Sequence, residues 1–274
     1  MFATLFDSRE YAPTVEARIA LLQRLGGPFF ADRLDEVLLA RAAGLPVGLL
    51  VDADAADDGR QAGELSGHLA DAVRDAAPEI VAIRCSALGD ARIRDEAIGG
   101  AERRSQLLAR LATSLDGLRG AHRMIVAIDG ALAPLTAAEW GSLAAESLAI
   151  DPIRDPDSWR AAATWPGTRG LLLGLIPPPG GPAPEGPEVL LWAIGYAASL
   201  GGRGGDRVGI AAIPRRGAAA RRGDPVEDAD AAARIDTLCT LVDLTAADGA
   251  SRRARLDPRA MSPAAPLLSR RRSR

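Results

Sequence analysis

The sequence contains no lysine and no asparagine, and all of its 33 basic residues are arginine. Without lysine, the chain cannot form a Schiff base with a carbonyl substrate, and it cannot contain the lysine of a phosphate-binding loop. Such a composition is typical of a GC-rich genome, so the arginine content alone does not indicate a function.

Cysteine, histidine and aromatic residues are also scarce. The two cysteines, Cys85 and Cys239, lie too far apart in the sequence to indicate a disulfide framework, and they do not form a zinc motif by themselves. Aromatic residues make up 4% of the chain and the formal net charge is −3. A nucleic-acid-binding core is therefore disfavoured, because it needs stacking platforms and a basic surface.

No apolar run approaches the length of a bilayer-spanning helix, and the first residues lack the order of a signal peptide. The sequence therefore predicts a cytoplasmic protein without a membrane partner. It specifies neither a cofactor nor an oligomeric state.

The segment Ser251–Arg274 differs from the rest of the chain. It carries eight arginines, one acidic residue (Asp257) and three prolines, without sustained periodicity. These features predict a disordered basic tail, which is either a solvated terminus or an arm for nucleic acid or an acidic partner. Residues 1–250 are predicted to form a single α/β domain.

Short apolar runs that end in turn residues dominate the middle of the chain. Met124–Ile128, Ser147–Ile150 and Leu171–Ile176 are each typical of a strand buried on both faces, as in a parallel sheet. Similar strands are expected at Val47–Val51, Ile80–Ile83 and Val208–Ile213, with Phe2–Phe6 as a seventh.

Amphipathic stretches alternate with these runs. Helices are expected at residues 13–25, 31–43, 64–76, 102–118, 134–146, around 159, at 187–200 and at 224–244. Alternating strands and helices favour a (β/α)8 barrel, which seven strands leave incomplete. The alternative is an open doubly wound sheet, but no strand runs into the G-x-G-x-x-G motif of a dinucleotide-binding fold.

In a barrel, the residues that follow the strands converge on one mouth, where active sites lie. Cys85, Asp129 and Asp151 are the candidate catalytic residues at this mouth. The candidate ligand-binding residues are Asp52, Asp54, Arg84, Ser86, Arg215 and Arg216.

Each candidate also has a structural alternative. A nearby positive charge favours the thiolate, so Cys85 beside Arg84 suits a nucleophile, although it also suits a packed thiol. Arg215 and Arg216 can clamp a carboxylate or phosphate, or lie in a solvated loop.

The acidic candidates are equally open to two interpretations. Asp52 and Asp54 can bind a hard cation or form an exposed turn. Asp129 and Asp151 can take part in chemistry or cap the following turn or helix.

Residues 120–244 carry the patterns "SLAIDPI", "RGLLLGLIPP" and "DRVGIAAI", and "PEIVAIRCSALGD" lies upstream. This order resembles the catalytic barrel of cobalamin-independent methionine synthases, within the uroporphyrinogen decarboxylase-like group. The resemblance implies a TIM-barrel fold and methyl transfer to a thiol. In that family a zinc ion, held by His, Cys, Glu and Cys, activates the thiol of homocysteine.

The residues depart from this family at the metal site. The strand that should end in His-x-Cys ends in Ile128-Asp129-Gly130, and His122 lies at its opposite end. Glu146 stands where the family's glutamate is expected, but Arg215 and Arg216 follow the strand that should precede the last cysteine. The fold resemblance therefore persists while the zinc ligands are missing.

Three functions follow as hypotheses. The first is a diverged barrel protein without the zinc site, acting as an accessory protein that binds a small anionic ligand or a partner protein. The second is an active methyltransferase of the methionine synthase group. The third is a barrel enzyme of another class that uses Asp52, Asp129 and Asp151 with a divalent metal ion.

Overall fold

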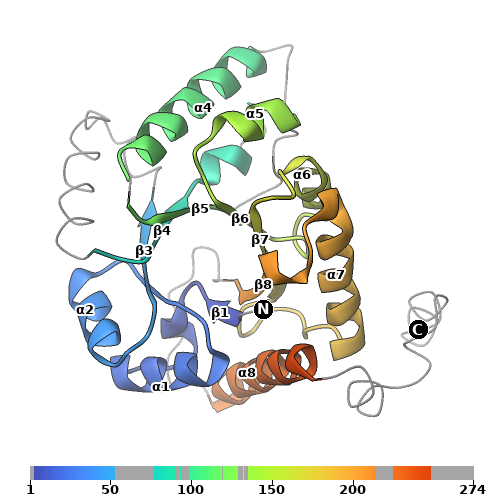
Figure 1. The fold of residues 1–274 in the computed structure, drawn as a ribbon. Helices are drawn as coiled ribbons and strands as arrows, with labels where there is room; N and C mark the ends of the chain where they lie inside the picture. Colours follow the sequence, from blue (N-terminus) through green and yellow to red (C-terminus); the bar gives the residue numbers. More distant parts are fainter. Residues whose placement is uncertain are drawn as a thin grey trace.

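A computed structural model describes residues 3–52, 77–89, 93, 99–118, 120–128, 132, 135–213 and 225–247. In these ranges eight parallel strands form one sheet that curves into a nearly closed barrel, with helices around its outside (Figure 1). The strands are β1 (Ala3–Leu5), β2 (Phe29–Ala31), β3 (Val47–Asp52), β4 (Ile80–Arg84), β5 (His122–Ala127), β6 (Ser147–Ile150), β7 (Gly170–Ile176) and β8 (Val208–Ala212).

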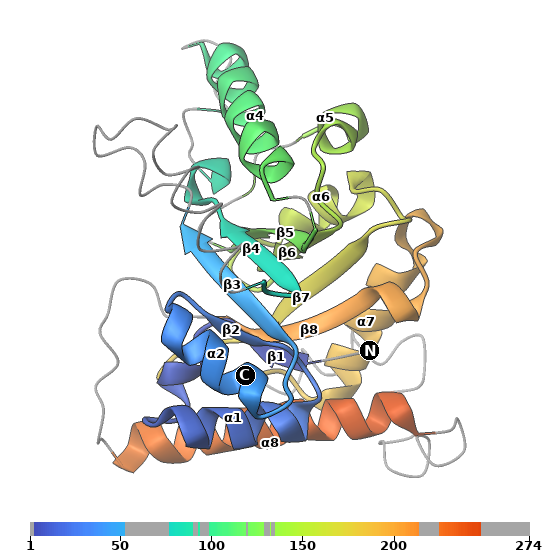
Figure 2. The same ribbon diagram turned by 60° about the vertical axis from the view of Figure 1, so that its left-hand side comes forward.

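The helices are α1 (Val15–Leu25), α2 (Leu34–Ala42), α4 (Gly100–Asp116), α5 (Ala137–Ser142), α6 (Ser158–Thr164), α7 (Pro187–Ser199) and α8 (Pro225–Ala246). Figure 2 shows α1 and α8 side by side along one side of the barrel. Short 3-10 turns follow several strands and helices, among them η1 (Ser8–Glu10) after β1 and η3 (Ser86–Gly89) after β4.

The hydrogen-bonded order of the strands is β1-β8-β7-β6-β5-β4-β3-β2, so β1 and β2 are the edges that meet where the barrel closes. At this seam the hydroxyl of Thr4 donates to the carbonyl of Pro28 at 2.7 Å. A Cβ atom at Gly27 would lie 1.8 Å from the carbonyl oxygen of Ala3. The two edges can therefore approach only because residue 27 has no side chain.

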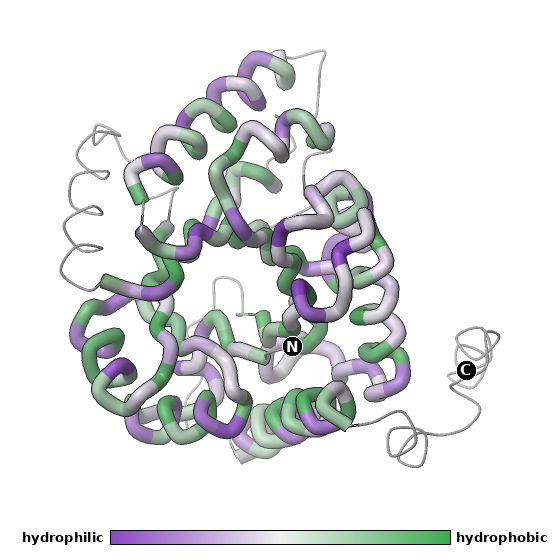
Figure 3. Tube along the Cα trace, in the orientation of Figure 1, coloured by the Kyte–Doolittle hydropathy of each residue, from purple (hydrophilic) through white to green (hydrophobic). Residues whose placement is uncertain are grey.

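Buried apolar side chains fill the inside of the barrel. Figure 3 shows hydrophobic residues along the strands around its centre. The ring of Phe30 occupies the space that Gly48 leaves, since a Cβ at Gly48 would lie 2.4 Å from it. Phe6 packs against Phe30 with ring centroids 5.4 Å apart. The inner cluster consists of Phe6, Phe30, Ala82, Met124, Val126, Ile128, Ala149, Leu172, Ala211 and Ile213.

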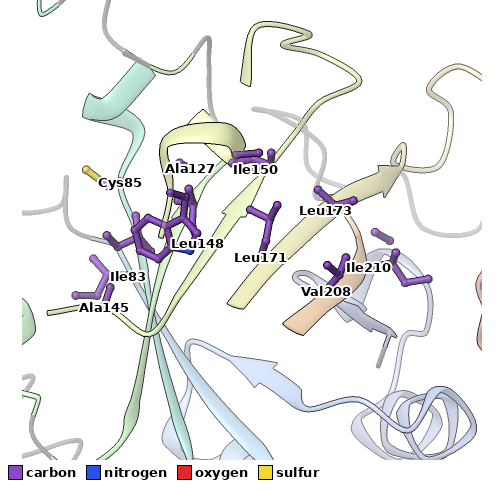
Figure 4. Close-up of a cluster of buried hydrophobic side chains, with 14 of the residues drawn as sticks. Ile83, Cys85, Ala127, Ala145, Leu148, Ile150, Leu171, Leu173, Val208 and Ile210 are labelled. Carbon is purple, nitrogen blue, oxygen red and sulfur yellow. The ribbon is translucent and has the colours of Figure 1, made fainter. Parts of the chain in front are cut away.

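The alternate residues of each strand face the helices and form a larger cluster. Figure 4 shows part of this layer, in which Ile83 and Cys85 of the β4 region lie with Leu148 and Ile150 of β6. This alternation sorts every strand residue into an inner or an outer position. It therefore decides which residues at a strand end can reach the mouth.

The structure confirms the predicted barrel and the seven expected strands, and it excludes the open doubly wound sheet. The eighth strand is β2, which the sequence did not reveal because it has three residues between Pro28 and Asp32. The helix expected from residue 31 begins instead at Leu34.

The helix expected at 134–146 is shorter, and runs from Ala137 to Ser142. Thr136 and Glu139 fix its start by a capping box, in which each side chain bonds to the other's backbone N–H. The long last helix is confirmed as α8.

Among the described residues, no helix combines the length and the apolar composition that crossing a membrane requires. The expected helix at 64–76 and the segment 251–274 lie outside the described residues. The domain boundary at residue 250 therefore stays a prediction.

Candidate functional site

A cavity of about 150 Å³ lies where β1, β2, β3 and β4 end, at the mouth of the barrel. Its lining consists of Phe6, Asp7, Arg9, Asp32, Leu50, Val51 and Arg84. Pockets for drug-sized ligands occupy about 300–1,000 Å³, so this cavity fits a smaller molecule. Its position is the one at which barrel enzymes and binding proteins place their ligands.

Arg84 enters the cavity because it is the last residue of β4. Ala82 belongs to the inner cluster, so residue 84 two positions later points the same way. The backbone of Arg84 pairs in register with Asp52 of β3 on one side and with Val126 of β5 on the other. A guanidinium is thereby anchored on a rigid strand end and not on a loop.

Arg9 reaches the cavity from η1, directly after β1. Its Nη2 donates to Oδ1 of Asp32 at 2.6 Å, and its Nε lies 3.4 Å from Oδ1 of Asp7. Burial alone would lower the pKa of Arg9, but the carboxylates of Asp32 and Asp7 outweigh that effect and raise it. The pair with Asp32 also ties the end of β1 to the end of β2 across the seam.

The remaining lining is apolar. Phe6 and Leu50, which belong to or pack against the inner cluster, contribute hydrocarbon surface beside the two guanidinium groups and the two carboxylates. Such a lining combines charge recognition with contact to an apolar part of a ligand. The arrangement can hold a small organic acid by its charged group and by its hydrocarbon part at once.

Cys85 lies on the other face of β4. It is 1% exposed and belongs to the outer cluster between strands and helices (Figure 4). Ser86 begins the 3-10 turn η3 that follows. The structure thus separates Cys85 from Arg84, although the two are adjacent in sequence, and neither Cys85 nor Ser86 lines the cavity.

Asp151 ends the β6 region and is almost completely buried. Its Oδ1 accepts hydrogen bonds from the backbone N–H groups of Ile153 and Arg154, at 3.1 and 2.9 Å. The Nε of Arg154 lies 3.4 Å from its Oδ2. These bonds are those of the turn-forming aspartate that the sequence offered as the alternative to a catalytic role.

A neighbouring aspartate, Asp155, shapes the mouth in a similar way. Its Oδ2 accepts from the N–H of Leu132 at 2.8 Å and so holds the connection that follows β5. Of the other candidates, Asp54, Asp129, Arg215, Arg216 and the side chain of Asp52 lie outside the described residues.

His122 and Glu146, of which only Glu146 stands at a position of the family's zinc site, both lie at the amino end of the barrel strands. The Nε2 of His122 is 2.7 Å from Oγ of Ser147, and burial lowers the pKa of His122. Burial alone would raise the pKa of Glu146, but hydrogen bonds from Arg123 lower it. In the described part of the chain, no three side chains of His, Cys, Asp or Glu come together to hold a metal ion.

Sequence reasoning missed Asp7, Arg9 and Asp32. The signal was present, because Asp7 and Asp32 each follow an apolar run, as the chosen aspartates do. The three residues Phe29–Ala31 are too few to predict a strand, so the sequence pattern places Asp32 in the helix expected at 31–43. Arg9 carries no local signal, since its place depends on the seam between β1 and β2.

No protein-family model and no curated protein matches the sequence. Among solved structures, the B12-independent methionine synthase of Shewanella sp. W3-18-1 is 10% identical, with a TM-score of 0.52 over 78% of this chain and 68% of that one. A D-psicose 3-epimerase is 12% identical, with a TM-score of 0.54 over 89% and 98%. These likenesses show the fold alone: the chain is a TIM-barrel-like protein.

Proposed function

We propose that this barrel protein binds a small organic anion at its mouth and does not carry out zinc-dependent thiol methylation. The carrying observation is Arg84, which the end of β4 directs into a cavity lined also by Arg9, whose charge the carboxylates of Asp7 and Asp32 balance. A strand-anchored guanidinium suits a carboxylate or phosphate, because its donors match two oxygens of such a group.

The apolar lining narrows the class of ligand. Phe6 and Leu50 offer contact to a hydrocarbon chain, and the cavity volume admits a short one. A small carboxylic acid with a few apolar carbons therefore fits better than inorganic phosphate. Burial of each additional methylene contributes about 0.8 kcal/mol when it leaves water completely.

Loss of zinc chemistry is supported by where three of the four cysteines and histidines lie, the fourth, His68, being outside the described residues. Cys85 packs in the outer layer, Cys239 lies on α8, and His122 lies at the far end of the barrel. None of these three side chains lines the cavity. Homocysteine alkylation by the purified protein, or one equivalent of zinc that only a chelator removes, would contradict this part of the proposal.

The binding proposal is tested by thermal unfolding with acetate, butyrate, inorganic phosphate and butylamine. We expect butyrate to raise Tm more than acetate or phosphate, and butylamine to leave it unchanged, since a bound ligand stabilises the folded state. Arg84→Gln should abolish the butyrate effect, and Arg84→Lys should weaken it.

The matched control is Arg160→Gln, which removes the same charge from an arginine that is 78% exposed on α6. This variant should keep the full response to butyrate. Equal responses of the Arg84→Gln and Arg160→Gln proteins, or a response to butylamine as large as that to butyrate, would refute an anion site at Arg84.

A further inference from the structure

Helix α7 presents an uncovered aromatic surface on the outside of the barrel. Trp192 is 57% exposed and Tyr196 is 41% exposed, and Val189 is exposed beside them. Trp159 of α6 is half-buried and borders the same surface. We call these four residues the aromatic face.

Ring–ring contacts fix the positions of the three aromatic side chains in the aromatic face. Trp192 and Tyr196, one helical turn apart, stack with their centroids 5.4 Å apart and their planes 2° apart. Trp159 meets Tyr196 edge-on, at 5.2 Å and 70°. Gly195, the residue before Tyr196, is exposed, and nothing lies within 4 Å of where its Cβ would be. The face is therefore a preformed platform that a partner can approach closely.

Charge distinguishes α7 from the other long outer helices. Its 13 residues include one charged residue, Glu188, whereas the 17 residues of α4 include five. An outer helix of a barrel normally turns a charged face to water. The apolar, slightly acidic outer face of α7 is instead typical of a helix that meets a partner.

The segment 251–274 has the complementary composition. Its eight arginines and three prolines are the residue types that stack on tryptophan and tyrosine, and it has one acidic residue. Helix α8, which precedes it, packs against α7 (Figures 1 and 2). A 13-residue helix is about 20 Å long, a distance that about six extended residues span, so the segment is long enough to reach the face.

We propose that residues 251–274 dock on the aromatic face of the same molecule, with arginine guanidinium groups stacked on Trp192 and Trp159. Nucleic acid fits this face poorly, because α7 contains no basic residue. The Arg-rich segment would thereby cover an apolar surface that otherwise promotes association between molecules.

Acrylamide quenching of tryptophan fluorescence tests the docking in the full chain. Trp140 and Trp165 are buried, so the quenchable emission comes from Trp159 and Trp192. Replacement of the eight segment arginines by glutamine should raise the quenching constant several-fold, and replacement by lysine should raise it less, since lysine stacks less well. Unchanged quenching in the glutamine protein would overturn the proposal.

Trypsin supplies a second readout, because it cleaves after arginine and the segment contains eight. In proteins with the native segment, Trp192→Ala and Tyr196→Ala should speed cleavage within 251–274 several-fold. Leu38→Ala, which removes an exposed apolar side chain from α2, is the matched control and should not. Equal cleavage rates in all three would contradict docking, and protection that grows with protein concentration would assign the face to a second copy instead.

Discussion

The β1–β4 side of the barrel mouth and the part of the barrel around β6, β7 and α8 use arginine in opposite ways. At the cavity, Arg9 is 34% exposed and its partners are carboxylates, and Arg84 lies beside it at a strand end. Around β6, β7 and α8, Arg203 and Arg234 are 0% exposed, and most of their partners are backbone carbonyls. The chain has no lysine, so one residue type serves both for recognition and for internal support.

The two buried arginines have few donors left for a ligand. Arg234 makes five hydrogen bonds: it donates to the carbonyls of Pro177, Gly181 and Pro182 at 2.9–3.0 Å, and from both Nε and Nη2 to Asp230. Because guanidinium has five N–H donors, such a residue is already saturated. Burial and the kind of acceptor therefore separate a supporting arginine from a binding one.

Arg203 supports the joints between helices in the same manner. It donates to the carbonyls of Ala197, Ala162, Trp165 and Arg169 at 3.0–3.3 Å. Burial lowers the pKa of Arg203, and no carboxylate among its hydrogen-bond partners compensates. Hydrogen bonds to the surrounding carbonyl oxygens thus offset the free-energy cost of burying this charged guanidinium.

Arg234→Met should have the largest effect on stability. It leaves three carbonyls without their donor and breaks the ion pair with Asp230, whose Oδ2 still accepts from the N–H of Gly180, so we expect a loss of about 3–5 kcal/mol in the free energy of unfolding. Urea denaturation followed by circular dichroism measures it. Arg160→Met, at an exposed position on α6, should cost under about 0.5 kcal/mol; similar losses in both would remove the distinction between the two sides.

Arg203→Met should come second, at about 2–3 kcal/mol, because it leaves carbonyls unpaired but no charge. The same denaturation series measures it. If this variant were as stable as the parent, buried arginines bound to carbonyls would not stabilise the fold, and they would not differ in this respect from the arginines of the cavity.

Arg9→Gln should have the smallest effect on stability. Its ion pair joins an arginine that is 34% exposed to an aspartate that is 51% exposed, and such pairs contribute about 0–1 kcal/mol. Affinity for butyrate should fall instead, as measured by titration calorimetry. A large loss of stability with unchanged affinity would place Arg9 with the supporting arginines.

The sequence predicted the barrel because most strands are uninterrupted apolar runs, which depend little on distant contacts. It missed β2, because a three-residue strand between Pro28 and Asp32 has too few residues to show a period. Seven apolar runs left open whether the barrel is complete, and β2 supplies the eighth strand.

The site was less accessible to sequence reasoning. Arg84 lines the cavity at the mouth, whereas Cys85, one position later, faces the opposite way because strand residues alternate, and the roles proposed for both stay predictions. The carbonyl acceptors of Arg234 lie 52 to 57 residues away in the chain, so no local pattern reveals them. Arg9 likewise acquires its partner Asp32 only when the barrel closes.

The closure between β1 and β2 has a mechanical consequence. In the part of the chain that the structure describes, no backbone ladder joins these two strands, and Thr4, Gly27 and the Arg9–Asp32 pair hold them together. The cavity lies across this weakest line of the wall. A ligand bound in this cavity would contact both edge strands and so stabilise the seam. Binding should therefore slow amide exchange in β1 and β2 more than in β5 or β6.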